Sequence, residues 1–321
     1  MKIVILDGYT VSSEDLSWDS LGDLAELTYY PRTAPQDIVG RIGSAEIVLT
    51  SKCLIDAAVL DACPSLKYIG VIATGYNNIE VAAARARGIA VTNIPEYSTA
   101  SVAQQVFALL LEITNQTAKQ SESVRAGDWQ NSADFSYTAA PISDLCGKTL
   151  GIVGYGSIGK RVAEISQAFG LNVIVHTPHP PKTLENAAGS GGTFVSLDEL
   201  LEKSNIITFH CPLTPDTDKL VNKTSIQKMQ DGVILINTAR GGLIDEADLA
   251  EALRTGKVAA AGLDVLSREA PRDGNPLIGI ENCIITPHIA WATPDSRVRI
   301  IDIAYKNIAA FLSGEKLNRI D

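Results

Sequence analysis

Three polar side chains in the last third of the chain could together transfer a proton next to a bound anion. Arg240 lies in the stretch NTARGG, Glu269 in GLDVLSREAP and His288 in ITPHIAW. Histidine exchanges protons near neutral pH, a nearby carboxylate favours its charged form, and a guanidinium matches the geometry of a carboxylate. The three residues therefore predict acid–base chemistry on a small anionic substrate.

The elements that must position these side chains are short strands. The apolar runs VILIN, AAGLDVL and CIIT come just before Arg240, Glu269 and His288, respectively. In an open α/β sheet, ligands bind in the crevice beyond the carboxyl ends of the strands. We therefore expect the three side chains to meet at one edge of a parallel sheet.

A glycine-rich turn lies upstream of these strands. Gly154, Gly156 and Gly159 form G-x-G-x-x-G between an apolar run, Leu150–Val153, and a helical stretch, Lys160–Phe169. Between a strand and a helix this pattern is typical of dinucleotide binding, because the glycines let the backbone approach a pyrophosphate at the helix N-terminus. A hydride donor, a proton donor and an anion clamp together favour a nicotinamide-dependent oxidoreductase acting on a 2-keto or 2-hydroxy acid.

The choice between NAD and NADP depends on the end of the second strand, which reads NVIVHTPHP. An Asp or Glu is expected there to bind the adenosine ribose, but Thr177 occupies the position. His179 and Lys182 are close enough in sequence to meet a 2′-phosphate, although no Arg is. We expect NAD, with NADP as the alternative.

Composition excludes several other classes of protein. The chain has 321 residues and a net charge of −10, which disfavours nucleic acid and anionic membranes as partners. The start, MKIVILDGYT, does not resemble a signal peptide, and no apolar stretch is long enough to span a bilayer. The five cysteines lack CxxC spacing, so we expect buried, reduced thiols, a cytoplasmic protein and no metal site.

Alternating strand-like and helical segments predict two α/β domains. A first series of strands covers Lys2–Leu6, Glu46–Leu49, Tyr68–Ile72 and Ile89–Thr92. A second series of six covers Thr149–Val153, Asn172–Val175, Asn205–Phe209, Val233–Ile236, Ala259–Asp264 and Cys283–Ile285. Between the two series, Ser98–Arg125 is expected to be one long helix, followed by a loop anchored by Trp129, Phe135 and Tyr137. The helical tail, Pro294–Leu312, is expected to pack back on the first domain.

The chain resembles the D-isomer-specific 2-hydroxyacid dehydrogenase family over nearly its whole length. The resemblance rests on TGYNNIE, GKTLGIVGYGSIGKRVAE, HCPLTPDT, MQDGVILINTARGGLID, GLDVLSREAP and TPHIAW. It implies two doubly wound parallel-sheet domains, with a Rossmann dinucleotide-binding domain (99–292) inserted into a smaller flavodoxin-like substrate domain (1–98 and 293–321). It also implies His288 as acid and base, Glu269 as its carboxylate partner and Arg240 as carboxylate clamp.

The same resemblance implies further contacts. The substrate would meet the backbone around Thr74, Gly75 and Tyr76 together with Arg240 and His288. The expected cofactor contacts are Gly154, Gly156, Ser157, Ile158, Gly159, Thr177, Cys211, Pro212, Thr217, Thr238, Ala239, Asp264 and Ala290. Members of the family associate as homodimers through the nucleotide domain, so we expect a dimer.

The stretch NIPEYSTASVAQQ (93–105) and the aromatic loop after it resemble the glycerate dehydrogenase/hydroxypyruvate reductase branch. We therefore expect reduction of hydroxypyruvate or glyoxylate. One alternative is another D-2-hydroxy acid dehydrogenase, for lactate or 3-phosphoglycerate; a phosphorylated substrate needs further cations, and Lys52 is the only obvious one. A second alternative is a nucleotide-sensing corepressor-like binding protein, which can retain Arg240, Glu269 and His288.

Overall fold

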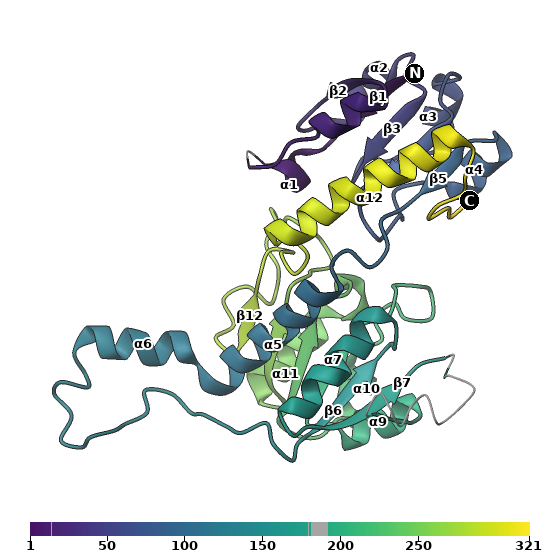
Figure 1. Cartoon of the computed structure of the whole chain (residues 1–321). Helices are drawn as coiled ribbons and strands as arrows, with labels where there is room; N and C mark the ends of the chain where they lie inside the picture. The colour runs from purple at the N-terminus through teal and green to yellow at the C-terminus, as the bar shows by residue number, and fades with distance from the viewer. Residues whose placement is uncertain (14, 179, 181–191) are drawn as a thin grey trace. The chain divides into compact units, whose positions relative to one another are not determined.

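The computed structural model describes residues 1–13, 15–178, 180 and 192–321. The chain forms two compact units (Figure 1). The first unit comprises Met1–Ser98 and Trp291–Asp321, and the second comprises Thr99–Ala290. We call them the first unit and the dinucleotide unit, and each is described by itself.

The first unit contains a sheet of five parallel strands in the order β2-β1-β3-β4-β5. The strands are β1 (Lys2–Ile5), β2 (Glu26–Tyr29), β3 (Ile47–Thr50), β4 (Tyr68–Val71) and β5 (Ala90–Thr92). This is the flavodoxin-like order, in which ligands bind where the strand order reverses. The sequence did not predict β2, because this edge strand reads ELTY and is largely exposed.

Helices cover both faces of this sheet. They are α1 (Tyr9–Ser12), η1 (Asp19–Asp23), η2 (Pro35–Asp37), α2 (Ile38–Ile42), α3 (Ala57–Ala62), α4 (Val81–Ala86) and α12 (Pro294–Ser313). Successive strand residues point to opposite faces. One face packs Ile3, Ile5, Ile47 and Leu49 against Ile300, Ala304 and Ile308 of α12. The other packs Val4, Val48, Ile69 and Val91 against Ile42, Leu60 and Ala84 of α2, α3 and α4.

The dinucleotide unit contains seven parallel strands in the order β12-β11-β10-β9-β6-β7-β8. They are β6 (Thr149–Val153), β7 (Asn172–His176), β8 (Gly192–Phe194), β9 (Ile206–Phe209), β10 (Val233–Asn237), β11 (Val258–Leu263) and β12 (Cys283–Ile285). Six of them follow the order of a dinucleotide-binding sheet, with β12 added at one edge. The expected fold class, two doubly wound parallel sheets, is confirmed. The short edge strand β8 was not predicted.

Helices also cover both faces of this second sheet. They are α5 (Thr99–Asn115), α6 (Thr117–Ala126), α7 (Ser157–Ala168), α9 (Leu197–Lys203), α10 (Lys223–Lys228), η3 (Gly241–Leu243) and α11 (Glu246–Thr255). One core cluster joins α5 and α7 to the sheet through Val106, Leu110, Val162, Ile152 and Ile236. The opposite cluster joins α9, α10 and α11 to it through Leu200, Ile226, Leu249, Ile207 and Leu235.

The expectation of one long helix over Ser98–Arg125 is wrong. Gln116 adopts a left-handed conformation (φ 46°, ψ 45°) that separates α5 from α6. The apolar spacing that buries α5 stops at Ile113, and α6 reads TAKQSESVRA with no buried residue. Within the dinucleotide unit, α6 projects away from the sheet (Figure 1). The chain bends because α6 has no apolar face to pack against the sheet.

Two smaller expectations also need correction. The aromatic residues expected to anchor the loop after α6 lie at the surface, since Trp129 is 52% and Phe135 92% exposed, although Trp129 Nε1 does bond the carbonyl oxygen of Phe135. Cys146 is exposed, whereas the sequence predicted a buried thiol. Among the residues that the structure describes, no helix is long and apolar enough to cross a bilayer. The same residues hold no cluster of His, Cys, Asp or Glu that could bind a metal ion.

Candidate active site

His288 and Glu269 lie in direct contact at the carboxyl edge of the dinucleotide sheet. Nδ1 of His288 is 2.8 Å from Oε2 of Glu269. Glu269 follows β11 and His288 follows β12, which is the neighbouring strand. A carboxylate only accepts hydrogen bonds, so Nδ1 is the donor and Nε2 remains to exchange a proton with a ligand. The side chains are 29% and 39% exposed, respectively, so a ligand can reach them.

The loop that carries His288 is fixed by Asp264, the first residue after β11. This carboxylate is buried and accepts the N–H groups of Ile289 (2.9 Å) and Ala290 (2.8 Å). The backbone N–H of His288 bonds the carbonyl oxygen of Asp264. His288 has φ 55°, a left-handed conformation that non-glycine residues keep only when their surroundings impose it. Asp264 provides that constraint.

Thr286 links this aspartate to helix α5. Its hydroxyl donates to Oδ1 of Asp264 (2.5 Å) and accepts from Nε2 of Gln105 (3.2 Å). Asp264 was expected as a cofactor contact, and its role in ordering the loop was not predicted. No sequence pattern pointed to Gln105 either, because its position on α5 has meaning only once α5 packs on the sheet.

Arg240 follows β10, the strand next to β11. Buried Asn237 shapes the turn, because its side chain donates to the carbonyl oxygen of Arg240 (2.9 Å) and accepts from the N–H of Ala239 (3.0 Å). At Gly241 a Cβ atom would lie 1.9 Å from the carbonyl carbon of Leu266. The turn that carries Arg240 therefore packs against the segment leading to Glu269 only because residue 241 is glycine.

The three fingerprint glycines divide into two kinds. A Cβ at Gly154 (φ 98°) would lie 2.6 Å from the carbonyl carbon of His210, and a Cβ at Gly159 would lie 2.2 Å from the carbonyl oxygen of Gly154. These two glycines let the turn pack against β9 and α7. At Gly156, in contrast, a Cβ would have no described atom within 4 Å. Gly156 caps α7, which begins at Ser157 and Ile158, so open space lies where a helix N-terminus favours phosphate.

Thr177 is the first residue after β7. The carbonyl oxygen of His176 accepts the N–H of Gly154 (2.8 Å), so Thr177 lies next to the glycine turn. Its side chain offers one hydroxyl and no charge. His179 and Lys182 lie outside the described residues.

The loop after β9 borders the same edge of the sheet. The backbone N–H of His210 bonds the carbonyl oxygen of Val153, and burial lowers the pKa of His210 to about 3, so the ring is neutral. Burial also raises the pKa of the neighbouring Cys211 thiol, which therefore stays protonated. The Thr217 hydroxyl closes the loop on the carbonyl oxygen of Pro212 (2.7 Å).

Thr238 follows β10, just before Ala239. Its hydroxyl oxygen is buried and has no hydrogen-bond partner among the described residues. A buried polar atom of this kind suits a bound ligand. Together with the open space at Gly156, it fits a dinucleotide lying along the carboxyl edge of this sheet.

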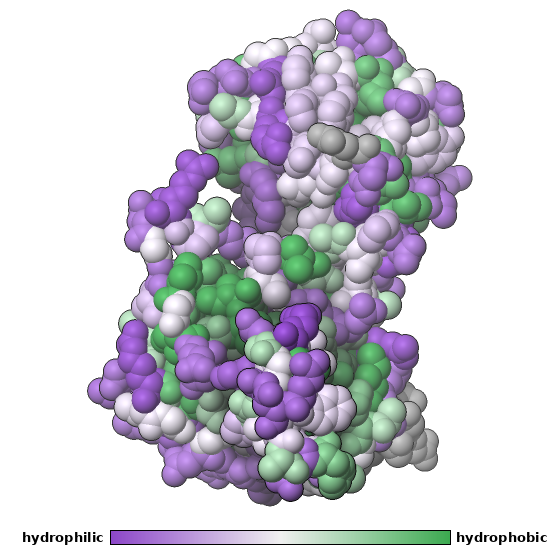
Figure 2. All heavy atoms as spheres, turned by 90° about the vertical axis from the view of Figure 1, so that its left-hand side faces the viewer, coloured by the Kyte–Doolittle hydropathy of each residue, from purple (hydrophilic) through white to green (hydrophobic). Residues whose placement is uncertain are grey.

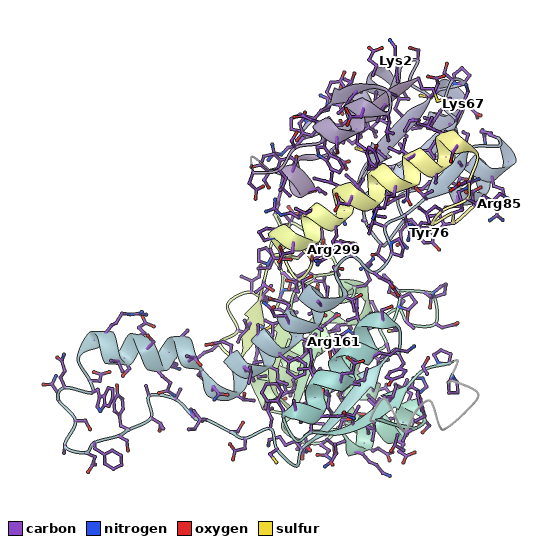
Figure 3. All side chains as sticks on the ribbon, viewed as in Figure 1. Lys2, Lys67, Tyr76, Arg85, Arg161 and Arg299 are labelled. Atoms are coloured by element: carbon purple, nitrogen blue, oxygen red, sulfur yellow. The ribbon has the colours of Figure 1, made fainter. Side chains whose placement is uncertain are left out.

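The residues expected to bind the substrate carboxylate, Thr74, Gly75 and Tyr76, lie in the first unit, in the loop after β4. Tyr76 is 43% exposed (Figure 3). Asn93, which the sequence did not single out, donates its amide to the carbonyl oxygen of Thr74 (2.8 Å). Lys52, the candidate cation for a phosphorylated substrate, bonds the Asp7 carboxylate through its backbone N–H (2.6 Å).

Comparison with known proteins points to one family. Residues 107–290 match the family model described as D-isomer specific 2-hydroxyacid dehydrogenase, NAD binding domain. The chain is 46% identical to a hydroxypyruvate reductase of Blautia hydrogenotrophica, with 100% of both chains covered. It is 38% identical to a glycerate dehydrogenase of Methylorubrum extorquens, covering 100% of this chain and 99% of the relative. An acyclic imino acid reductase, solved in complex with NADPH and D-Arg, superposes with a TM-score of 0.87 at 30% identity over 100% of both chains.

Proposed function

Because the chain belongs to the D-isomer-specific 2-hydroxyacid dehydrogenase family, we propose that it reduces hydroxypyruvate or glyoxylate to D-glycerate or glycolate. The relatives with those activities support this choice within a family that reduces 2-keto acids to D-2-hydroxy acids. The observation that carries the proposal is the contact between His288 and Glu269 in the unit that holds the glycine turn. That contact leaves Nε2 of His288 available as the proton donor.

His288 and Glu269 perform the proton half of the reaction in this proposal. Nε2 of His288 gives a proton to the carbonyl oxygen, and in the oxidation direction it takes the proton back. Glu269 holds the ring in place by accepting the hydrogen bond of Nδ1. When bound, the reduced nicotinamide supplies the hydride that the carbonyl carbon accepts. Hydride plus proton converts the carbonyl group to the alcohol and leaves the substrate carboxylate unchanged.

Arg240 is proposed to bind the substrate carboxylate and to polarise the keto oxygen. A guanidinium presents parallel N–H groups that fit a carboxylate in two-point contact. Its Nη1 also bonds the carbonyl oxygen of Ala239 (2.7 Å), which limits the freedom of the side chain. The backbone of Thr74, Gly75 and Tyr76 is proposed as the second anchor for the same carboxylate.

We propose NAD as the cofactor, because the family model that the chain matches describes an NAD-binding domain. The proposed contacts are Gly154, Gly156, Ser157, Ile158, Gly159, Thr177, Cys211, Pro212, Thr217, Thr238, Ala239, Asp264 and Ala290. NADP is the alternative, since Thr177 brings no negative charge against a 2′-phosphate. The imino acid reductase of similar structure binds NADPH, which supports this alternative.

A homodimer through the dinucleotide unit is proposed as the working form. Helix α6 has no buried residue, and Trp129, Phe135 and Tyr137 after it are exposed. Residues of hydrophobic type gather on the side of the dinucleotide unit from which α6 projects (Figure 2). Exposed aromatic side chains after α6, together with hydrophobic residues exposed on the same unit, suit burial against a second copy. The five free cysteines fit the reducing cytoplasm, which is the expected compartment.

The test is oxidation of NADH and NADPH with hydroxypyruvate, glyoxylate, pyruvate and 3-phosphohydroxypyruvate. We expect the highest kcat/KM with hydroxypyruvate or glyoxylate. Preference for pyruvate or for the phosphorylated acid would replace the proposed substrate but keep the reaction. Absence of turnover with all four acids, together with tight NADH binding, would favour the corepressor-like alternative.

A further inference from the structure

Hydrogen bonds fasten the loop after β4 to the residues that follow β5. Nδ2 of Asn93 donates to the carbonyl oxygen of Thr74 (2.8 Å). The hydroxyl of Thr74 donates to the carbonyl oxygen of Ile94 (2.8 Å), whose own N–H bonds the carbonyl oxygen of Ala73 (3.0 Å). Three bonds therefore fix the first part of the loop that is proposed to bind the substrate carboxylate.

Asn93 is fixed in turn by helix α12. The buried side chain of Asn307 donates its amide to the carbonyl oxygen of Asn93 (3.0 Å). The amide oxygen of Asn307 accepts from Nδ2 of Asn318 (2.8 Å), and the backbone N–H of Asn93 bonds the carbonyl oxygen of Asn318. The backbone N–H, the backbone carbonyl and the side-chain NH2 of Asn93 are thus bonded, as are the amide nitrogen and oxygen of Asn307, and a polar network of this kind is rigid.

The far end of this network is held along β5. The N–H of Ile320 bonds the carbonyl oxygen of Val91 (2.9 Å), and the N–H of Val91 bonds a carboxylate oxygen of Asp321 (2.8 Å). An antiparallel bridge pairs Arg319 with Thr92. The segment Asn318–Asp321 therefore extends the sheet beside β5 and provides a firm support for Asn93.

The hold on the Thr74 carbonyl has a geometric consequence for the next peptide group. In a trans peptide the C=O and the following N–H point in opposite directions. The structure contains no cis peptide among the described residues, so fixing the Thr74 carbonyl towards Asn93 aims the N–H of Gly75 away from it. Among the described residues, no acceptor bonds the N–H of Gly75 or of Tyr76. These two donors are free to bind a ligand.

We infer that Asn93 is a positioning residue for the substrate carboxylate, and that Asn318–Asp321 acts on the same loop through Asn307 and Asn93. The inference rests on the proposed function. Asn93 orients the Gly75 N–H group before substrate arrives, so less ordering is needed on binding. Its loss weakens binding of the keto acid. It leaves the cofactor site, which lies in the other unit, intact.

The main test compares Asn93→Ala with wild type at saturating NADH. We expect KM for hydroxypyruvate to rise about tenfold, because the Gly75 N–H loses its fixed direction, while kcat and the Kd for NADH change less than twofold. Hydrogen exchange measured by mass spectrometry should speed up in the peptide that covers 73–77. A purely structural role would lower the melting temperature without a selective change in KM.

A second variant and a matched control extend the test along the network. Asn318 has φ 50°, so Asn318→Gly keeps the left-handed backbone and removes only the amide bond to Asn307. We expect a smaller rise in KM, about twofold to threefold. The control is Asn172→Ala, which loses the same kind of bond, to the carbonyl oxygen of Gly147 (3.0 Å), at the start of β7. KM should not change in the control.

The outcomes separate the inference from the function on which it rests. An active wild type whose KM and loop exchange survive Asn93→Ala unchanged would overturn the inference and leave the proposed function standing. Faster loop exchange with an unchanged KM would also overturn it, because the ordered loop would then not bind the substrate. Wild type without turnover on any 2-keto acid would overturn the proposed function and the inference together, before any variant is made.

Discussion

His288 donates its backbone N–H to the carbonyl oxygen of Asp264 at 2.8 Å. The carboxylate of the same aspartate accepts the next two N–H groups along the chain, those of Ile289 and Ala290. One buried residue thus fixes the main chain at and just after the proposed proton donor. The direction of the imidazole depends on this hold as well as on its bond to Glu269.

The first prediction follows from this hold. In Asp264→Asn an NH2 group replaces one carboxylate oxygen. It faces a backbone N–H of the loop, from Ile289 or Ala290, and leaves that N–H without an acceptor. We expect kcat to fall at least tenfold and the free energy of unfolding to fall by about 1–3 kcal/mol. Asp248→Asn is the matched control, because its carboxylate also accepts a backbone N–H, from Lys223 (2.7 Å), but on α11. Equal kcat in both variants would show that Asp264 has no role in positioning His288.

The second prediction concerns the proton donor itself. His288→Asn removes the group that protonates the carbonyl oxygen but leaves the glycine turn untouched. Turnover should fall by roughly 10²-fold or more, which is the usual contribution of a general acid. NADH binding, measured by fluorescence titration, should stay within twofold of wild type. Turnover close to wild type would mean that the proton comes from another group.

The third prediction concerns the anion clamp. Arg240→Lys keeps the positive charge but loses the planar pair of donors. Both KM and kcat should worsen, because one group is proposed to bind the carboxylate and to polarise the keto oxygen. Steady-state kinetics and thermal melting separate this role from a structural one. A change in melting temperature alone would assign Arg240 to stability.

The fourth prediction concerns cofactor choice. Thr177→Asp adds two acceptor oxygens for the ribose hydroxyls and a negative charge against a 2′-phosphate. A charge-assisted hydrogen bond contributes about 1.5–3 kcal/mol, so the ratio of kcat/KM for NADH to that for NADPH should rise roughly tenfold or more. Both values are measured in wild type and variant. If the ratio did not move, Thr177 would not face the adenosine ribose.

The fifth prediction concerns acid stability. Burial lowers the pKa of His210 to about 3, so below pH 6.5, the ordinary value, the unfolded chain takes up a proton that the folded chain does not. This residue therefore stabilises the fold fully above pH 6.5, and the contribution falls by about 1.4 kcal/mol per pH unit down to about pH 3. In His210→Gln the free energy of unfolding, measured with urea, should fall less between pH 7 and pH 5 than it does in wild type. A loss as steep as in wild type would mean that His210 is hydrated and titrates normally.

The sequence predicted the buried strands better than the exposed ones. A strand covered on both faces, such as β10 with VILIN, reads as a continuous apolar run. The edge strands β2 and β8 lie outside the predicted set, because half-exposed residues carry no such pattern. The bend between α5 and α6 was missed because helical spacing does not show where a helix leaves the sheet.

The site, too, could be predicted only in part. That His288 and Glu269 meet could be anticipated, because each follows a strand and β11 and β12 are neighbours in the sheet. The hydrogen bonds between Asp264 and the loop of His288 could not be anticipated, because they depend on the left-handed backbone at His288. Asn93 was missed for a related reason, because its partner on α12, Asn307, is 214 residues away in sequence.

The dependence of the first unit on α12 sets an order of events during synthesis. Domains fold as units as they leave the ribosome. Ile3, Ile5 and Ile47 line a sheet face that packs against Ile300 and Ile308 of α12, beside Val11 of α1 and Leu21 of η1. The part made first therefore lacks the α12 share of this core until residues 99–290 have been made. The nascent chain should complete its second unit before its first, and chaperones should bind that face in the interval.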